Sequence, residues 1–258
     1  MSLVQGIRST ARLAPLVRER TRFARHQLSS GTVPARYHVA EGGMVVHLRH
    51  HTPDIAAFEQ AFGEEQTAMP APVLAALRAL DHPLRVADLG ANIGLFGAHL
   101  LRTFPDATID FYEPDPDNVE ILRATAEANG AGRHTIIAAC AATQDGELRF
   151  SAGNFTNSRI EPDGSGIAVP AVDVFPRLSG VDFLKIDIEG GEWALLDDPR
   201  FSALDVTAIA LEYHAHMAPP GDPVEQVLRV LRAGGYESLN VPIASTPGHG
   251  MVWAWKAG

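Results

Sequence analysis

Three polar residues close two apolar segments of this sequence, and their types could support proton transfer. Asp187 follows Phe183–Ile186, and Glu212 and His214 close the later segment Leu211-Glu-Tyr-His. The carboxyl ends of parallel strands share one sheet edge, so we expect these side chains to meet there. They could form a general-base system or bind one hard divalent cation, although no metal is predicted. His214 is the first choice of base, because an unperturbed histidine titrates near neutral pH.

A glycine-containing turn, Asp88-Leu-Gly-Ala-Asn-Ile-Gly94, follows another apolar segment and precedes a helical pattern. Gly90 permits a sharp turn and a close approach of a ligand, and Gly94 lets the helix pack near the strand. Free N–H groups at the helix start would face the ligand. The turn departs from the G-x-G-x-x-G pattern, with Asp88 in first place and Asn92 in the middle. A carboxylate there repels a diphosphate, so an adenosyl compound with an amino-acid tail is expected.

Two further positions fit an adenosyl ligand. Glu113 comes 25 residues after Asp88, at the end of the next predicted strand, where an acid can accept hydrogen bonds from both ribose hydroxyls. Ala141 lies in a run of small residues after the third predicted strand, which leaves room for adenine. The neighbouring Cys140 is interpreted as a small buried filler, because it has no positive neighbour to activate it.

The lysine and glutamate around Asp187 also have structural interpretations. Lys185 points to the same face of the strand as Asp187, and a buried lysine beside an aspartate can be a structural pair. Glu192 falls in the first turn of the next helix, where it would complement the helix dipole. The spacing alone leaves structural and functional roles open.

The elements that would position these residues form a regular pattern after residue 84. Short apolar segments alternate with helical ones, which predicts a doubly wound α/β fold with a mostly parallel sheet covered on both faces. The chain ends in two strands joined by a short loop, an antiparallel hairpin, and Gln144-Asp145-Gly146 is a second hairpin signal before a strand at 147–150. The predicted strands are 84–89, 108–112, 135–139, 182–188, 206–212, 236–241 and 251–255, and the predicted helices are 93–103, 116–129, 190–196 and 223–233.

The first 80 residues are expected to form a helical extension to a main domain at 81–258. A helix should run from Pro15 to about Gln27 and end before Gly31 and Pro34, followed by a strand at 44–48 and helices at 54–62 and 71–80. Residues 1–36 hold seven arginines and one acid. This arginine-rich segment is interpreted as a solvated arm that packs on the main domain or on a second subunit, which allows a homodimer; a transit peptide or a surface-binding helix is the alternative.

Composition limits the class of protein further. The chain has 258 residues, 46% hydrophobic and 20% charged, as in an ordinary globular protein. Its net charge of −10 argues against a nucleic-acid partner, and no apolar run is long enough to span a membrane. The single cysteine excludes an internal disulfide framework. A cytoplasmic location fits these features.

The motifs together resemble the FkbM-type S-adenosylmethionine-dependent methyltransferases. The resemblance covers about residues 84–240 and rests on the turn at 88–94, Glu113-Pro, Leu184-Lys-Ile-Asp-Ile-Glu-Gly-Gly-Glu192 and Leu211-Glu-Tyr-His214. Gly191 stands where the family often has alanine. The resemblance implies a seven-stranded class I methyltransferase sheet with an antiparallel last strand. It also implies O-methylation of a hydroxyl or carboxyl group on a small molecule or sugar, often in natural-product or saccharide biosynthesis.

On this resemblance, the methyl donor S-adenosylmethionine occupies the glycine-containing turn. Gly90 and Asn92 would contact its methionine tail, Glu113 its ribose and Ala141 its adenine. Asp187 would lie near its amino group or a metal. Residues 1–80 would form a lid and the pocket for a small-molecule acceptor. Two other classes remain open from the residues: a nicotinamide-dependent oxidoreductase, which the acid at 88 opposes, and a non-catalytic binding module with the same fold.

Overall fold

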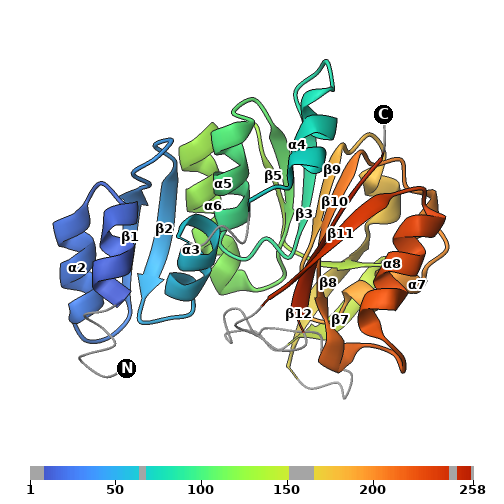
Figure 1. The fold of residues 1–258 in the computed structure, drawn as a ribbon. Coiled ribbons are helices and arrows are strands. Elements are labelled where there is room, and N and C mark those ends of the chain that lie inside the picture. Colours follow the sequence, from blue (N-terminus) through green and yellow to red (C-terminus); the bar gives the residue numbers. More distant parts are fainter. Residues whose placement is uncertain (1–8, 64–67, 151–165, 244–248, 257–258) are drawn as a thin grey trace.

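A seven-stranded sheet forms the centre of the molecule (Figure 1). The computed structural model describes residues 9–63, 68–150, 166–243 and 249–256. Every pairing in the sheet is parallel except those of β12, which runs antiparallel to both of its neighbours. In spatial order the strands are β11 (Glu237–Pro242), β12 (His249–Trp255), β10 (Ala208–His214), β9 (Phe183–Ile186), β3 (Arg85–Leu89), β4 (Thr108–Tyr112) and β5 (Thr135–Ile137). This order confirms the predicted doubly wound sheet and its C-terminal hairpin.

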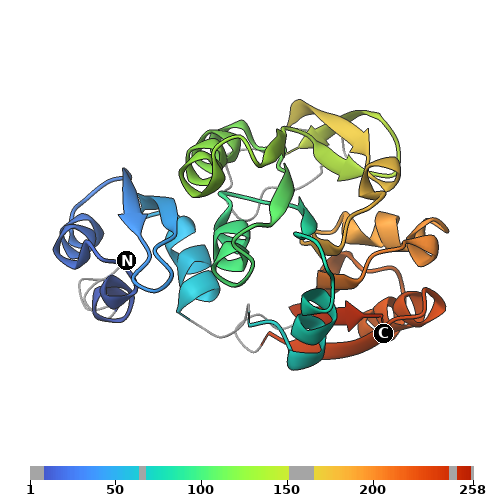
Figure 2. The same cartoon turned by 90° about the horizontal axis from the view of Figure 1, so that it is seen from above.

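Helices cover both faces of the sheet (Figure 2). One apolar core packs α4 (Ala71–Arg78), α5 (Leu95–Thr103) and α6 (Pro116–Gly130) on one face, and another packs α7 (Glu192–Asp197) and α8 (Pro223–Ala233) on the opposite face. None of the helices in the described part of the chain is long and apolar enough to cross a bilayer.

The start of α8 illustrates how sequence and packing cooperate. The carboxylate of Asp222 accepts hydrogen bonds from the N–H groups of Val224 and Glu225, which satisfies two of the unpaired donors of the first turn. Val227 and Leu231, four residues apart, are both fully buried against the sheet. A strong cap and one apolar stripe are therefore enough to place this helix.

The change of helix face falls between β3 and β9, which lie side by side. The chain leaves β3 toward α5 on one face and leaves β9 toward α7 on the other. In open α/β sheets, ligands bind at the carboxyl ends of strands at this switch of direction. The glycine-containing turn after β3 and Asp187 after β9 both lie at this point.

The N-terminal segment differs from the predicted helical extension. Its helix is split into a short 3₁₀ turn (Ala14–Leu16) and α2 (Arg20–Leu28), because Val17 between them is extended and bridges Val39. Pro34 does not simply follow a helix but lies in β1 (Val33–His38).

An antiparallel hairpin joins β1 to β2 (Val45–His50). Pro34 has no N–H to donate, and β1 tolerates this loss because it is an edge strand of a two-stranded sheet. Apolar residues of the hairpin and α3 (Asp54–Phe62) pack against Ile93 and Leu95, so the segment covers the glycine-containing turn (Figure 1).

A small three-stranded sheet contradicts the hairpin that was predicted at Gln144-Asp145-Gly146. It contains β6 (Cys140–Ala142), β7 (Gly146–Phe150) and β8 (Ile167–Asp173), with β8 in the middle. The hairpin expected at Gln144–Gly146 is therefore wrong, because β8 separates β6 from β7. No strand was predicted at β8, because its alternating Ile-Ala-Val-Pro-Ala pattern contains a proline.

Candidate active site

The glycine-containing turn meets the main chain after β9 at very short range. A Cβ atom on Gly90 would lie 1.7 Å from the carbonyl oxygen of Asp187, and Gly90 also has a positive φ of 80°. Glycine is thus required here by the neighbouring chain, in addition to any ligand. Gly94 has a positive φ as well, and its Cβ would lie 2.8 Å from Leu122 of α6, so the close packing predicted for it is against a helix.

Asn92 carries the clearest sign of a ligand at this turn. It adopts a left-handed conformation (φ 50°), which asparagine tolerates better than most residues. Its side-chain oxygen Oδ1 is buried and has no hydrogen-bond partner among the described residues. The side chain lines a cavity, where an ammonium or hydroxyl group could donate to this oxygen.

Glu113 stands directly beside Asn92, at the end of β4. Its carboxylate accepts hydrogen bonds from the N–H groups of Asn92 (2.8 Å) and Asp115 (2.9 Å). The side chain of Asn118 also hydrogen-bonds to the carboxylate, which still keeps acceptor capacity for a ligand hydroxyl. Burial raises the pKa of Glu113 to about 7, although these hydrogen bonds oppose the shift. The ribose role of Glu113 stays a prediction that this geometry permits.

Asp88 does not face the cavity, contrary to its predicted contact with the ligand. Its side chain is fully buried and lies 3.2 Å from the Nζ atom of Lys185. Lys185 also donates to the carbonyl oxygen of Gly90 (2.7 Å) and lies 3.5 Å from Asp187. Burial alone would lower the pKa of Lys185, but the charges of Asp88 and Asp187 together with the hydrogen bond to Asp88 outweigh burial and raise it. The structural interpretation of this pair is the better one: Asp88 holds Lys185, and Lys185 supports the turn.

A cavity of about 280 Å³ opens between this turn and the end of the sheet. Its polar end holds Asn92, Lys185, Asp187 and Glu212. The remaining walls are mostly apolar and include Ala57 and Ala61 of α3, Ile93, Leu95, Phe96, Val241, Pro242, Ile243 and Met251. The sequence had singled out none of these wall residues, because apolar side chains at the ends of elements give no functional signal.

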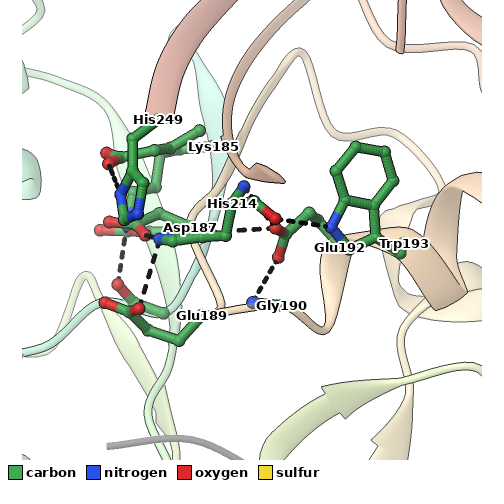
Figure 3. Close-up of polar contacts among 11 residues, drawn as sticks. Lys185, Asp187, Glu189, Gly190, Glu192, Trp193, His214 and His249 are labelled. Carbon is green, nitrogen blue, oxygen red and sulfur yellow. Dashed lines mark hydrogen bonds and ion pairs between the residues drawn. The ribbon is translucent and has the colours of Figure 1, made fainter. Parts of the chain in front are cut away.

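His214 does not line the cavity, and Asp187 and Glu189 contact its ring. Its side chain is 1% exposed, and the ring nitrogens contact Glu192 on one side and Glu189 on the other (Figure 3). Burial alone would lower the pKa of His214, but the hydrogen bond that its ring donates to Glu192 and the charges of Asp187, Glu192 and Glu189 raise it to about 9. The structure therefore brings Asp187, Glu212 and His214 together, as predicted, but only the two carboxylates line the cavity.

Two of the carboxylates around His214, Glu189 and Glu212, hold their protons more tightly than usual. Burial, and then the charge of Asp187, raises the pKa of Glu189 to about 7 and that of Glu212 to about 8. Two overlapping sets of side chains have the ligand atoms to hold a cation: one with Asp187, Glu189 and His214, and one with Glu212, His214 and His249.

The two small residues near the adenine position are buried. Ala141 packs in the core with Leu89 and Tyr112, and its contact with adenine stays a prediction. Burial, and then the charge of Glu113, raises the pKa of Cys140 to about 12, so its thiol stays protonated. This agrees with its interpretation as a filler.

Comparison with known proteins identifies the class. Residues 88–238 match the methyltransferase FkbM domain, and the chain belongs to this family. The family and the order of the sheet make it an S-adenosylmethionine-dependent methyltransferase of class I. None of the curated proteins matches it.

Several solved structures are similar in fold. The precorrin-6y C5,15-methyltransferase of Geobacter metallireducens GS-15 has 18% identity and a TM-score of 0.42, covering 72% of this chain and 87% of that one. TYW2 of M. jannaschii in complex with AdoMet has 15% identity and a TM-score of 0.44, covering 88% and 86%. WbdD has 15% identity and a TM-score of 0.49, covering 80% and 43%.

Proposed function

We propose that this methyltransferase transfers a methyl group to a hydroxyl oxygen of a small molecule, in natural-product or saccharide biosynthesis. The observation that carries the proposal is the cavity whose polar end combines Asn92 with the ionisable carboxylates of Asp187 and Glu212. The family supports methyl transfer, and the choice of oxygen as acceptor is ours.

The cofactor would be held by residues of the switch point. Glu113 accepts hydrogen bonds from the ribose hydroxyls, and Asn92 Oδ1 accepts one from the amino group of the methionine tail. The side chain of Asp187 is 31% exposed and adds a negative charge beside that amino group. When bound, S-adenosylmethionine supplies a methyl group already activated on a sulfonium. The main contribution of the protein is then alignment, worth on the order of 7–11 kcal/mol.

The acceptor would lie between α3 and the tips of β11 and β12. Ala57, Ala61 and Met251 offer apolar contact to its body, and Glu212 faces its reacting group. The two carboxylates at the polar end would repel an acceptor that is itself a carboxylate. A neutral hydroxyl on a partly apolar molecule therefore suits this cavity better than the carboxyl acceptor that the family also allows.

Glu212 is the group we assign as proton acceptor. It lines the cavity, and its raised pKa of about 8 makes it a stronger base than an ordinary glutamate. The acceptor oxygen forms its bond to the methyl carbon as the carbon–sulfur bond breaks, and the hydroxyl proton passes to Glu212. His214 remains a predicted participant, but it acts from behind Asp187 and Glu189.

The experiment is methyl transfer from labelled S-adenosylmethionine to a panel of paired compounds. Each pair has one apolar body that carries either a hydroxyl or a carboxyl group. Label in the hydroxyl compounds alone is the expected result. Label in the carboxyl compounds, or on nitrogen of amine analogues, would contradict the assignment of the acceptor.

A further inference from the structure

Both ring nitrogens of His214 face carboxylate oxygens. Nδ1 lies 3.0 Å from Oε1 of Glu192, and Nε2 lies 3.3 Å from Oε2 of Glu189. Glu192 has no exposed side-chain surface and comes from the first turn of α7, whereas Glu189 lies in the loop before it. His214 is thus held between two acids from one short stretch of chain (Figure 3).

The hydrogen bonds of Glu192 show that it acts only as an acceptor. Its Oε1 accepts from the main-chain N–H of His214 (2.9 Å) as well as from the ring, and its Oε2 accepts from the N–H of Gly190 (2.8 Å). An acid whose two oxygens both receive donors is best satisfied when ionised. Its sequence interpretation as a partner of the helix dipole is therefore incomplete.

The chemistry of imidazole then fixes the protonation of His214. A neutral ring has one N–H donor and one bare nitrogen, and a bare nitrogen facing a carboxylate oxygen would place two lone pairs together. Only the doubly protonated ring can donate to Glu192 and to an ionised Glu189 at once; a neutral ring would need the proton to lie on Glu189 instead. We infer that Glu192 and His214 form a buried carboxylate–imidazolium pair that positions the Asp187–Glu189 turn of the proposed active site.

The turn that this pair holds is not a relaxed one. Glu189 has a positive φ of 50°, and Gly190 follows with a φ of 100°. Trp193 adds a second anchor, because its Nε1 donates to the carbonyl oxygen of His214 (3.1 Å). Asp187 lies 4.0 Å from Nε2 of His214, so the imidazolium stabilises the negative charge at the edge of the cavity. His214 is then a positioning residue.

The charged and titratable neighbours of His214 come from several elements. The acids are Asp187, Glu189, Glu192 and Glu212, and the remaining groups are Lys185, His216 and His249. Burial opposes protonation of the ring, but these acids raise the pKa of His214 to about 9. The proton is therefore retained at neutral pH and lost above about pH 9.

The test is ¹⁵N NMR of histidine side chains in the full chain, which needs neither acceptor nor activity. The wild type should show both nitrogens of His214 protonated at pH 7, with a titration midpoint near 9. Glu192→Gln and Glu189→Gln should each lower that midpoint by at least about one unit, since each removes a neighbouring negative charge. Trp193→Phe is the matched control, because it removes a hydrogen bond to the main chain of His214 without touching its ring, and it should leave the midpoint unchanged.

Three results would overturn the inference. The first is a neutral His214 in the wild type at pH 7, which can be read even if Glu192→Gln does not fold. The second is a midpoint that neither glutamine variant shifts. The third is replacement of the ring N–H signals at pH 7 by signals of a metal-bound nitrogen on adding stoichiometric Zn²⁺, which is diamagnetic, because a metal would then take the place of the proton.

The inference and the proposed function fail in different ways. The positioning role, but not the NMR result, rests on the proposed function. In the assay, turnover of the wild type should fall above about pH 9. Turnover of Glu189→Gln should fall at a lower pH, by the same shift that NMR records for His214. An inactive wild type with a protonated His214 would refute the proposed function alone. An active wild type with a neutral His214 would refute the inference alone.

Discussion

Replacing Glu212 with glutamine tests the proposed chemistry with the least change in shape. Glutamine has the same size but cannot take up a proton at neutral pH. Glu212 is only 23% exposed at the end of β10, yet it lines the cavity, so the variant should keep the fold and the cofactor contacts. Turnover should fall by about 10²–10⁴-fold, the usual contribution of a general base. The dissociation constant of S-adenosylmethionine should change far less.

The pH dependence of the wild type gives the second half of this prediction. Burial, and then the charge of Asp187, raises the pKa of Glu212 to about 8. The base is protonated and inactive below that pH, so only about one molecule in ten is ready at pH 7. Turnover should rise through pH 8 and fall again as His214 loses its proton near pH 9.

The assay is saturation kinetics with labelled S-adenosylmethionine from acid to alkaline pH, with cofactor affinity measured by calorimetry. Glu225→Gln is the matched control, since Glu225 is an exposed glutamate of α8 far from the cavity. It should behave as the wild type. Wild-type turnover in Glu212→Gln, or a wild-type rate that stays flat between pH 7 and pH 8, would refute the assignment of the base.

Three further predictions concern the cofactor, the turn and metal. Glu113→Gln should weaken S-adenosylmethionine binding in calorimetry. The wild-type affinity should strengthen as pH rises through about 7, because burial raises the pKa of Glu113 to about 7 and the ribose hydroxyls donate to its ionised form. An affinity independent of pH would count against this role. Gly90→Ala should lower the free energy of unfolding by more than the roughly 1–2 kcal/mol that a left-handed alanine costs, because its Cβ would also meet the carbonyl oxygen of Asp187. Gly235→Ala is the control, since Gly235 has the same φ but open space around it, and it should show the backbone strain alone. Equal losses in denaturant melts would contradict the close contact at Gly90. Turnover should survive EDTA, since Lys185 and a protonated His214 offset the negative charge of the carboxylates. Activity that is lost in EDTA and restored by Mn²⁺ would contradict this.

The sheet could be predicted from the sequence because β3, β4, β9 and β10 are short apolar runs with a helical segment after each, and β11 and β12 form a hairpin. In the N-terminal hairpin, β2 was predicted as a strand at 44–48, but its partner β1 was not. Neither β1 nor β8 could be predicted, since both contain a proline and neither repeats a clear pattern. Tertiary contacts decide these strands: Val17 bridges Val39, and β8 lies between two strands that are closer in sequence.

The candidate site was predicted as a set of residues but not as an arrangement. Strand ends placed Glu113, Asp187 and Glu212 correctly at one edge. Periodicity cannot tell which acids lie in the cavity and which lie beneath it, and so Asp88 was assigned to the ligand although Lys185 covers it. The partner of His214 was also hidden, because Glu192 reaches it from another element 22 residues away.

The most direct test of the account is a crystal structure with S-adenosylhomocysteine. It should show the ribose hydroxyls within hydrogen-bond distance of the Glu113 carboxylate and the amino group of the tail at Asn92 Oδ1, with the sulfur directed toward Glu212. A ligand whose ribose lies elsewhere, or whose sulfur points away from the cavity between α3 and β12, would contradict the account.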